Sequence, residues 1–136
     1  ELLLEEWLPR RAAKDAAAGW GGDRVAVFSG ADTDGGGGRR VAVGWHVRYD
    51  TRDLAARGGN ALLRGVAAQA HATDATRGTA TPDCVERTAV GPLLVLRQGL
   101  DVAVVSGPYD RHGDTVVSAG TCARARPWAR RILAQN

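Results

Sequence analysis

Apolar and polar side chains alternate over residues 39–49, and this pattern constrains the fold more than any other feature of the chain. Every second position is apolar, at Val41, Val43, Trp45 and Val47. A period of two places these side chains on one face of a β-strand, the face that we expect to meet the core. A shorter apolar run at residues 25–28 precedes it, and the glycine-rich residues 29–38 lie between the two. The sequence therefore predicts a β-hairpin with a long tip.

Three segments have the composition of helices. Residues 2–18 are rich in alanine and leucine and end at Gly19, a good helix terminator. A second helix begins after Asp50 and Thr51, which can cap its free N–H groups. Gly58 and Gly59 inside it each cost about 1 kcal/mol relative to alanine, so we expect this helix to bend or to lie close to a neighbour. Residues 122–134 predict a closing helix.

The second half of the chain carries two or three further strands. Apolar runs at residues 93–97 and 100–106 flank Gln98-Gly99, a tight-turn signal. A weaker strand is predicted at 85–90 and a loop at 109–120. The chain thus predicts a single α+β domain over residues 1–136. We expect an antiparallel sheet of four to five strands with helices packed on one face, in the order α-β-β-α-β-β-β-α.

The 136 residues include no methionine, and the chain opens on Glu1-Leu2-Leu3-Leu4. We therefore expect it to be the C-terminal part, or a processed C-terminal fragment, of a longer protein. Its apolar fraction of 44% suits a globular core. No apolar run approaches the roughly 18 residues of a membrane-spanning helix, so no membrane span is predicted.

Positive charge is spread along the chain rather than gathered in one patch. All but one of the 18 basic residues are arginines, the exception being Lys14, and the net charge is +3. Acidic residues sit among most of the arginine clusters, and aromatic residues make up only 5% of the chain. Nucleic-acid binding favours clustered basic residues with interleaved aromatics. The composition therefore disfavours a nucleic-acid partner and favours a solvated surface.

No pattern of reactive side chains indicates catalysis. His46 falls on the polar face of a strand, and His71 and His112 fall in predicted loops, so we read all three as exposed histidines. None has the helical spacing of zinc ligands. The serines lack the turn that carries a nucleophile, and no lysine follows the glycine run as it would in a phosphate loop. We assign no catalytic, cofactor-binding or metal-binding residue to this chain.

Cys84 and Cys122 are the two cysteines, 38 residues apart. If the protein is exported, a disulfide between them would stabilise a small domain by about 3–4 kcal/mol. In a cytosolic protein they would be two free, buried thiols. We favour the disulfide and keep both readings open.

One stretch resembles a known family. The turn Gly19-Trp20-Gly21-Gly22-Asp23-Arg24 is followed by a strand, and Tyr49-Asp50-Thr51 then leads into a helix. This succession resembles the C-terminal part of a family of exported bacterial and archaeal proteins. Their upstream part looks like a gluzincin-type zinc metallopeptidase with a His-Glu-x-x-His helix. The likeness covers residues 1–70 and, more loosely, residues 93–107.

The resemblance transfers only the turn. Tyr49 stands where the family more often has Trp, and no His-Glu-x-x-His helix occurs in this chain, so no zinc ligand or catalytic Glu can be assigned. Any zinc would belong to the upstream part. The physical reading of the turn is structural: its glycines permit a tight path, Trp20 anchors it, and Asp23 and Arg24 satisfy backbone groups or each other. Peptide binding by the turn is the alternative.

Together these features predict a non-catalytic C-terminal domain that supports an exported zinc metallopeptidase-like protein in the cell envelope or outside the cell. Its expected partner is the upstream part of the same protein, contacted through the helix at residues 1–8. The alternative is a structural or interaction component of the envelope or of an extracellular assembly, without enzymatic activity. The sequence leaves open a homo-oligomer, and it leaves open whether the complete protein is an enzyme.

Overall fold

A computed structural model describes residues 10–31, 38–69, 83–86 and 91–135. These form an α+β fold, which confirms the predicted class. The elements in chain order are α2 (Arg10–Ala17), β1 (Trp20–Ala31), β2 (Arg39–Tyr49), α3 (Arg52–Gln69), β3 (Cys84–Val85), β4 (Leu93–Gln98), β5 (Asp101–His112), β6 (Thr115–Ser118) and α4 (Cys122–Ala134).

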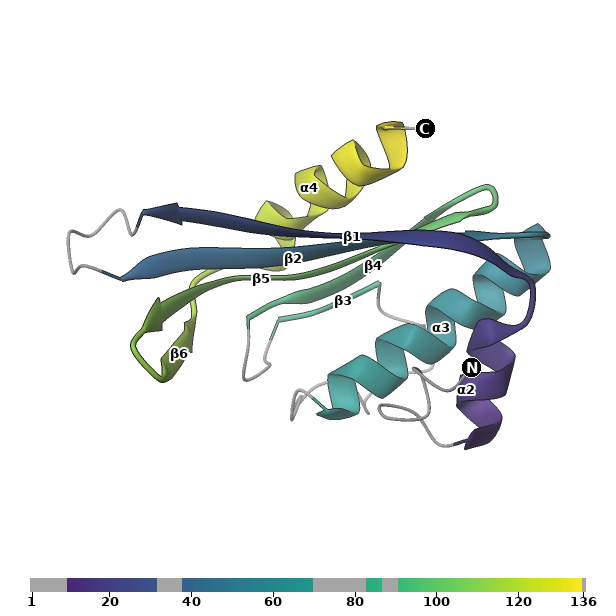
Figure 1. The fold of residues 1–136 in the computed structure, drawn as a ribbon, viewed down its shortest axis with the longest axis horizontal. Coiled ribbons are helices and arrows are strands. Elements are labelled where there is room, and N and C mark those ends of the chain that lie inside the picture. Colours follow the sequence, from purple (N-terminus) through teal and green to yellow (C-terminus); the bar gives the residue numbers. More distant parts are fainter. Residues whose placement is uncertain (1–9, 32–37, 70–82, 87–90, 136) are drawn as a thin grey trace.

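The sheet is antiparallel and is organised around β5. Its strands follow the order β1-β2-β5-β4-β3, and β6 pairs with β5 outside that path. The first half of β5 pairs with β4, and residues 109–112 pair with β6 instead. β2 runs along the other side of β5 over almost its whole length (Figure 1). The sheet is therefore long and narrow, with the β1–β2 hairpin projecting at one end.

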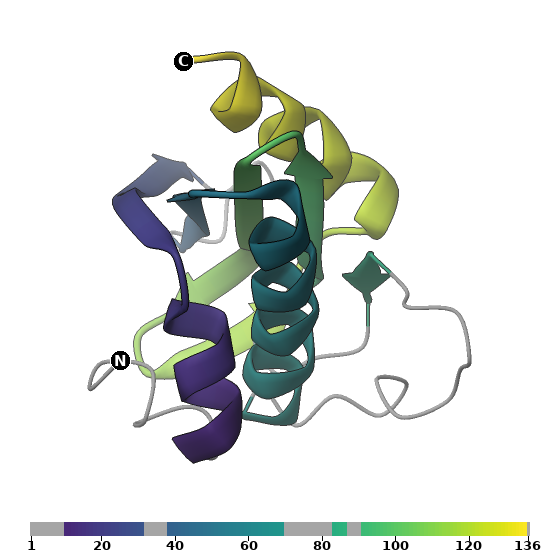
Figure 2. The same ribbon diagram turned by 90° about the vertical axis from the view of Figure 1, so that its right-hand side faces the viewer.

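The helices cover both faces of the sheet, so the prediction of helices on a single face is wrong. α2 and α3 pack on one face and α4 packs on the other (Figure 1 and Figure 2). The cause lies in β4 and β5, which are apolar at consecutive positions. Leu93 and Val95 join the core cluster of α2 and α3, whereas Leu94 joins the cluster of α4. A strand buried on both faces has a continuous apolar run rather than an alternating one.

The predicted order of elements lacks one strand. Residues 109–120, predicted as a loop, instead contain the end of β5 and all of β6, which brings the sheet to six strands in the described residues. All four β6 side chains are exposed, including Val116 and Val117. A strand without a buried face shows no apolar period, so the pattern did not reveal it.

Several predicted elements are confirmed. The helix after Asp50-Thr51 spans α3, and the Thr51 hydroxyl accepts a hydrogen bond from the Leu54 N–H as a cap. The turn at Gln98-Gly99 joins β4 to β5, and the closing helix has the predicted bounds. Residues 2–9 of the first predicted helix, residues 32–37 of the predicted hairpin tip, the segment 70–82 and residues 87–90 of the predicted strand at 85–90 lie outside the described residues. No helix in the described part is both long and apolar enough to cross a membrane.

Tyr49 forms the centre of the core beneath α2 and α3. Its side chain is 1% exposed, and its hydroxyl donates a hydrogen bond of 2.9 Å to the Ala16 carbonyl near the end of α2. Gly58 of α3 faces the same phenol ring, and a Cβ there would collide with the Tyr49 Oη and Cζ. The glycine therefore lets α3 lie close to its neighbour, as the sequence indicated.

On the opposite face, small residues of β2 make room for α4. Ala42 is buried, and a Cβ on Gly44 would lie 2.7 Å from the Ile132 Cδ1 of α4. On the α3 side, Trp45 and Val47 join the core cluster as predicted. Val41 and Val43 are only half-buried, on either side of a register shift between β2 and β5.

We expect Gly58→Ala to destabilise the protein, although alanine is normally the better helix residue by about 1 kcal/mol. The added methyl group would have to displace the Tyr49 ring, and overpacking of this kind costs about 1–3 kcal/mol. Gly59→Ala is the matched control, because its Cβ first meets the flexible Arg97 side chain, at 3.0 Å from Cδ. Urea unfolding of both variants measures the effect. A urea midpoint for Gly58→Ala equal to or higher than that of the wild type would contradict the contact between Gly58 and Tyr49.

Burial raises the pKa of Tyr49 to about 12. Because this folded-state pKa lies above the ordinary value near 10, the contribution of Tyr49 is complete below pH 10 and is lost as the pH rises through 12. We expect Tyr49→Phe to cost about 1 kcal/mol at pH 8, through the lost hydrogen bond. The variant should lose less stability than the wild type between pH 8 and pH 11. Urea unfolding at both pH values tests this, and equal losses would show that Tyr49 is not buried as a neutral phenol.

Candidate functional site

The turn predicted over Gly19–Arg24 is shorter than expected: Trp20–Arg24 already belong to the edge strand β1 and pair with β2, and the turn after α2 is confined to Ala18 and Gly19. Gly19 has a φ of +69°, in the region that favours glycine, and its carbonyl accepts the Asp50 N–H at 2.8 Å. A Cβ at Gly19 would also collide with the Leu54 Cδ1. Gly21 and Gly22 are exposed, and a register shift between β1 and β2 falls here. The turn thus links the end of α2 to the start of α3.

Two tryptophans hold the start of β1 against the core. The half-buried Trp20 packs 5.4 Å from Trp45, measured between ring centroids. The Trp45 Nε1–H donates a hydrogen bond of 2.9 Å to the Asp23 Oδ2. Asp23 therefore satisfies an indole N–H, where the sequence predicted a pairing with Arg24 or with backbone groups. Arg24 is exposed. Trp20 acts as an anchor, as expected from its position.

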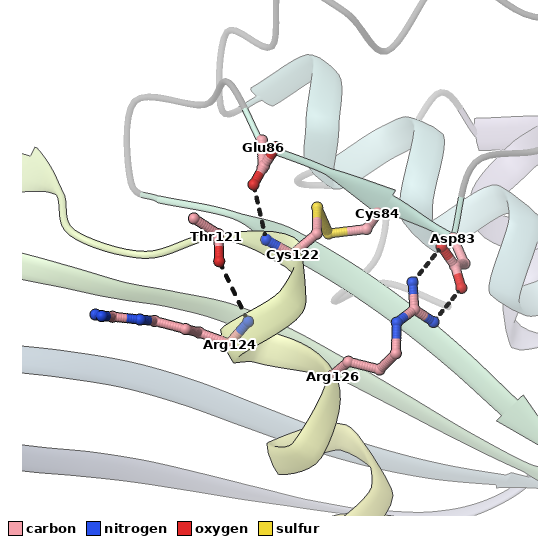
Figure 3. Close-up of a disulfide and its surroundings, with 7 residues drawn as sticks. All are labelled: Asp83, Cys84, Glu86, Thr121, Cys122, Arg124 and Arg126. Carbon is pink, nitrogen blue, oxygen red and sulfur yellow. Dashed lines mark hydrogen bonds and ion pairs between the residues drawn. A yellow bond between two sulfur atoms is a disulfide. The ribbon is translucent and has the colours of Figure 1, made fainter.

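Cys84 and Cys122 form a disulfide, with an S–S distance of 2.07 Å and a Cα–Cα distance of 5.9 Å. The bond links the edge strand β3 to the first residue of α4 (Figure 3). The structure therefore confirms the disulfide, and the alternative of two free thiols is wrong.

Polar contacts on either side of Cys84 reinforce this junction (Figure 3). The Cys122 N–H donates to the Glu86 Oε1 at 3.1 Å, and Arg126 donates two hydrogen bonds to the Asp83 carboxylate. The hydrogen bond from Arg126 holds the pKa of Asp83 below its ordinary value. The Thr121 hydroxyl accepts the Arg124 N–H and caps the helix. The disulfide, the Asp83–Arg126 ion pair and the Glu86–Cys122 hydrogen bond therefore fasten the first half of α4 to β3 and the residues on either side of it.

A groove opens between the fastened part of α4 and the projecting β1–β2 hairpin. It has a volume of about 580 Å³. Its apolar lining comes from β1, β2, β5 and α4, and includes Phe28, Val41, Ala42, Pro108, Pro127 and Trp128. Phe28 and Trp128 meet edge to face, with ring centroids 5.1 Å apart, and both remain more than one third exposed. Large aromatic rings thus line an open, concave surface.

Two arginines line the same groove and differ in their partners. Arg40 makes a two-point ion pair with Asp110, at 2.8 and 3.1 Å, and this bond holds the pKa of Asp110 below its ordinary value. The Arg124 guanidinium has no acidic partner among the residues that the structure describes. Counting only the residues that the structure describes, the groove therefore carries one uncompensated positive charge, that of Arg124.

The sequence did not reveal this groove, because its lining residues lie far apart in the chain. The available signal was local to α4. Arg124 and Trp128 are four residues apart, hence on one helix face, and no acidic residue occurs in that helix. That Arg124 and Trp128 are both exposed is evident only from the folded structure.

His46 and His112 do not line the groove. His46 was predicted to be exposed, but its side chain is 15% exposed and its Nε2 lies 2.9 Å from the Asp101 Oδ1, because β5 runs beside β2 at this point. His112 ends β5 rather than lying in a loop, and His71 falls outside the described residues. Within the described ranges, no three His, Cys, Asp or Glu side chains are grouped so as to hold a metal ion.

Comparisons with known proteins identify a family. One family model, Domain of unknown function (DUF8575), matches residues 3–117. No curated protein and no solved structure matches the chain. The matched region contains the described elements from α2 to β5 and ends before α4. Because it covers well over half of the chain, the protein belongs to the family described as Domain of unknown function (DUF8575).

Proposed function

We propose that this chain is a non-catalytic, disulfide-stabilised domain of an exported protein, and that it acts by binding. The observation that carries the proposal is the Cys84–Cys122 disulfide. Disulfides persist in oxidising compartments and are rare in the reducing cytosol. A bond that anchors a whole helix to a sheet edge fits a domain that works outside the cell or in the envelope.

Three carboxylates are engaged in hydrogen bonds that hold the fold together, which supports a non-catalytic role for them. Asp23 accepts from Trp45, Asp83 from Arg126 and Asp110 from Arg40. Each of these carboxylates serves the fold in the described structure. A carboxylate that acts as an acid or base needs a pKa near the working pH. Arg126 and Arg40 instead lower the pKa values of Asp83 and Asp110 below their ordinary range.

A narrower proposal follows from the resemblance of the Gly19–Arg24 turn. The domain supports an upstream part similar to a gluzincin-type zinc metallopeptidase, and contacts it through residues 1–8. The order of helix, turn, β1, β2 and α3 is consistent with the pattern on which that resemblance rests. Zinc and the catalytic residues would then belong to the upstream part.

The second candidate is a structural or interaction component of the envelope or of an extracellular assembly. Exposed apolar side chains on edge strands favour it. Val25 and Val27 of β1 are 61% and 66% exposed, and Val117 of β6 is 53% exposed. An open strand edge with exposed apolar residues is a surface that pairs readily with another chain.

Thiol mapping tests the exported state. When the protein is isolated from its own cells with an alkylating agent present, we expect neither cysteine to be labelled before reduction and both to be labelled after it. A Cys122→Ser variant is the control, because its single thiol at Cys84 should be labelled without reduction. Labelling of both wild-type cysteines before reduction would place the protein in a reducing compartment and contradict the proposal.

The complete gene product separates the two candidates. The metallopeptidase reading predicts an upstream His-Glu-x-x-His helix with a downstream Glu, and one bound zinc ion per purified full-length protein. Elemental analysis of that protein measures the zinc. A degenerate motif without bound zinc would exclude the peptidase reading and leave the assembly component.

A further inference from the structure

We infer that the groove between α4 and the β1–β2 hairpin binds a small anionic amphiphile, an apolar chain or ring that ends in a carboxylate. Phe28 and Trp128 would contact the apolar part, and Arg124 would pair with the carboxylate. This inference goes beyond the proposed function and holds whether or not the domain supports a peptidase.

The size and lining of the groove suit a small ligand. Its volume of about 580 Å³ falls within the roughly 300–1,000 Å³ of small-molecule sites. Most of its lining is apolar: Phe28 of β1 meets Trp128 of α4 edge to face, and Pro108 of β5 also lines the groove. Covering these half-exposed rings with an alkyl or aromatic group removes apolar surface from water, which favours binding.

Charge determines which kind of amphiphile fits. Asp110 neutralises Arg40 through two hydrogen bonds, so Arg40 contributes no net charge to the groove. Arg124 has no acidic partner in the described ranges and is exposed at the wall formed by α4. A guanidinium can bind one carboxylate through two parallel hydrogen bonds. The groove therefore matches a ligand with a single anionic end.

The position of Arg124 is well defined by the fold. Its backbone N–H is bonded to the Thr121 cap, and the disulfide of Cys122 lies two residues earlier in the chain. Arg131 also lies exposed on α4 but does not line the groove. These two arginines therefore form a matched pair for testing the role of local charge.

Calorimetric titration with octanoate and with 1-octanol tests the inference. We expect saturable binding of one octanoate per protein, tighter than that of the uncharged alcohol. Arg124→Gln should weaken octanoate binding about fivefold and leave octanol binding unchanged. Arg131→Gln should change neither. If Arg124→Gln and Arg131→Gln lose equal affinity for octanoate, Arg124 does not hold the carboxylate. The same follows if Arg124→Gln loses equal affinity for octanoate and for octanol.

Filling the groove tests its apolar part independently of charge. Gly30 lines the groove, and a Cβ built there meets none of the described atoms within 4 Å, so Gly30→Leu starts its side chain from open space beside the groove. We expect this variant to lose binding of both probes. Val27→Leu is the control, because Val27 is exposed on the other face of the same strand. Unchanged binding in Gly30→Leu would overturn the inference.

Vesicles of anionic phospholipid distinguish a membrane surface from a soluble ligand. The inference predicts that octanoate binds in the absence of any vesicle, at concentrations below its aggregation. Binding to vesicles with no detectable binding of free octanoate would assign α4 to a membrane surface and overturn the inference. Failure of the wild-type protein to bind either octanoate or 1-octanol would also overturn the inference.

Discussion

Burial of β4 and β5 on both faces is the constraint on which the rest of the fold depends. Val102 and Val104 belong to the core that α2 and α3 cover, whereas Ala103 and Val105 belong to the core beneath α4. Neither face of this strand pair can be left to water without exposing a row of apolar side chains. The two helical layers are therefore required by the same two strands, and β2 and β6 take their places along β5.

The disulfide ties the second of these layers to the sheet. The core under α4 is small, and three of its members are alanines. Short side chains bury little apolar surface, so α4 gains much from covalent attachment. Closing a loop of this length stabilises a domain by about 3–4 kcal/mol. The same bond holds the α4 wall of the groove in place, which connects the redox state of Cys84 and Cys122 to the shape of the candidate binding surface.

Elements with strong local signals could be predicted from the sequence, whereas relations between distant elements could not. The capped helix α3, the turn at Gln98-Gly99 and the closing helix were predicted because each carries its own cap, turn or apolar pattern. The prediction of helices on one face was wrong because β4 and β5 are apolar at consecutive positions and are buried on both faces, and because Gly44 of β2 leaves room for α4. The prediction missed β6 because none of its side chains is buried. The groove could not be predicted, since it exists only once Phe28 and Trp128 are brought together by β1 and α4.

The packing of α4 across the sheet is the central claim, since the second core rests on its contacts with β4 and β5 and the groove rests on its position beside the β1–β2 hairpin. Proton NMR tests it directly, because Phe28 is the single phenylalanine of the chain. With ring centroids 5.1 Å apart, the oxidised protein should show nuclear Overhauser contacts between the Phe28 ring and the Trp128 indole. Absence of these contacts in a folded, oxidised sample would contradict the position of α4 and the groove that depends on it.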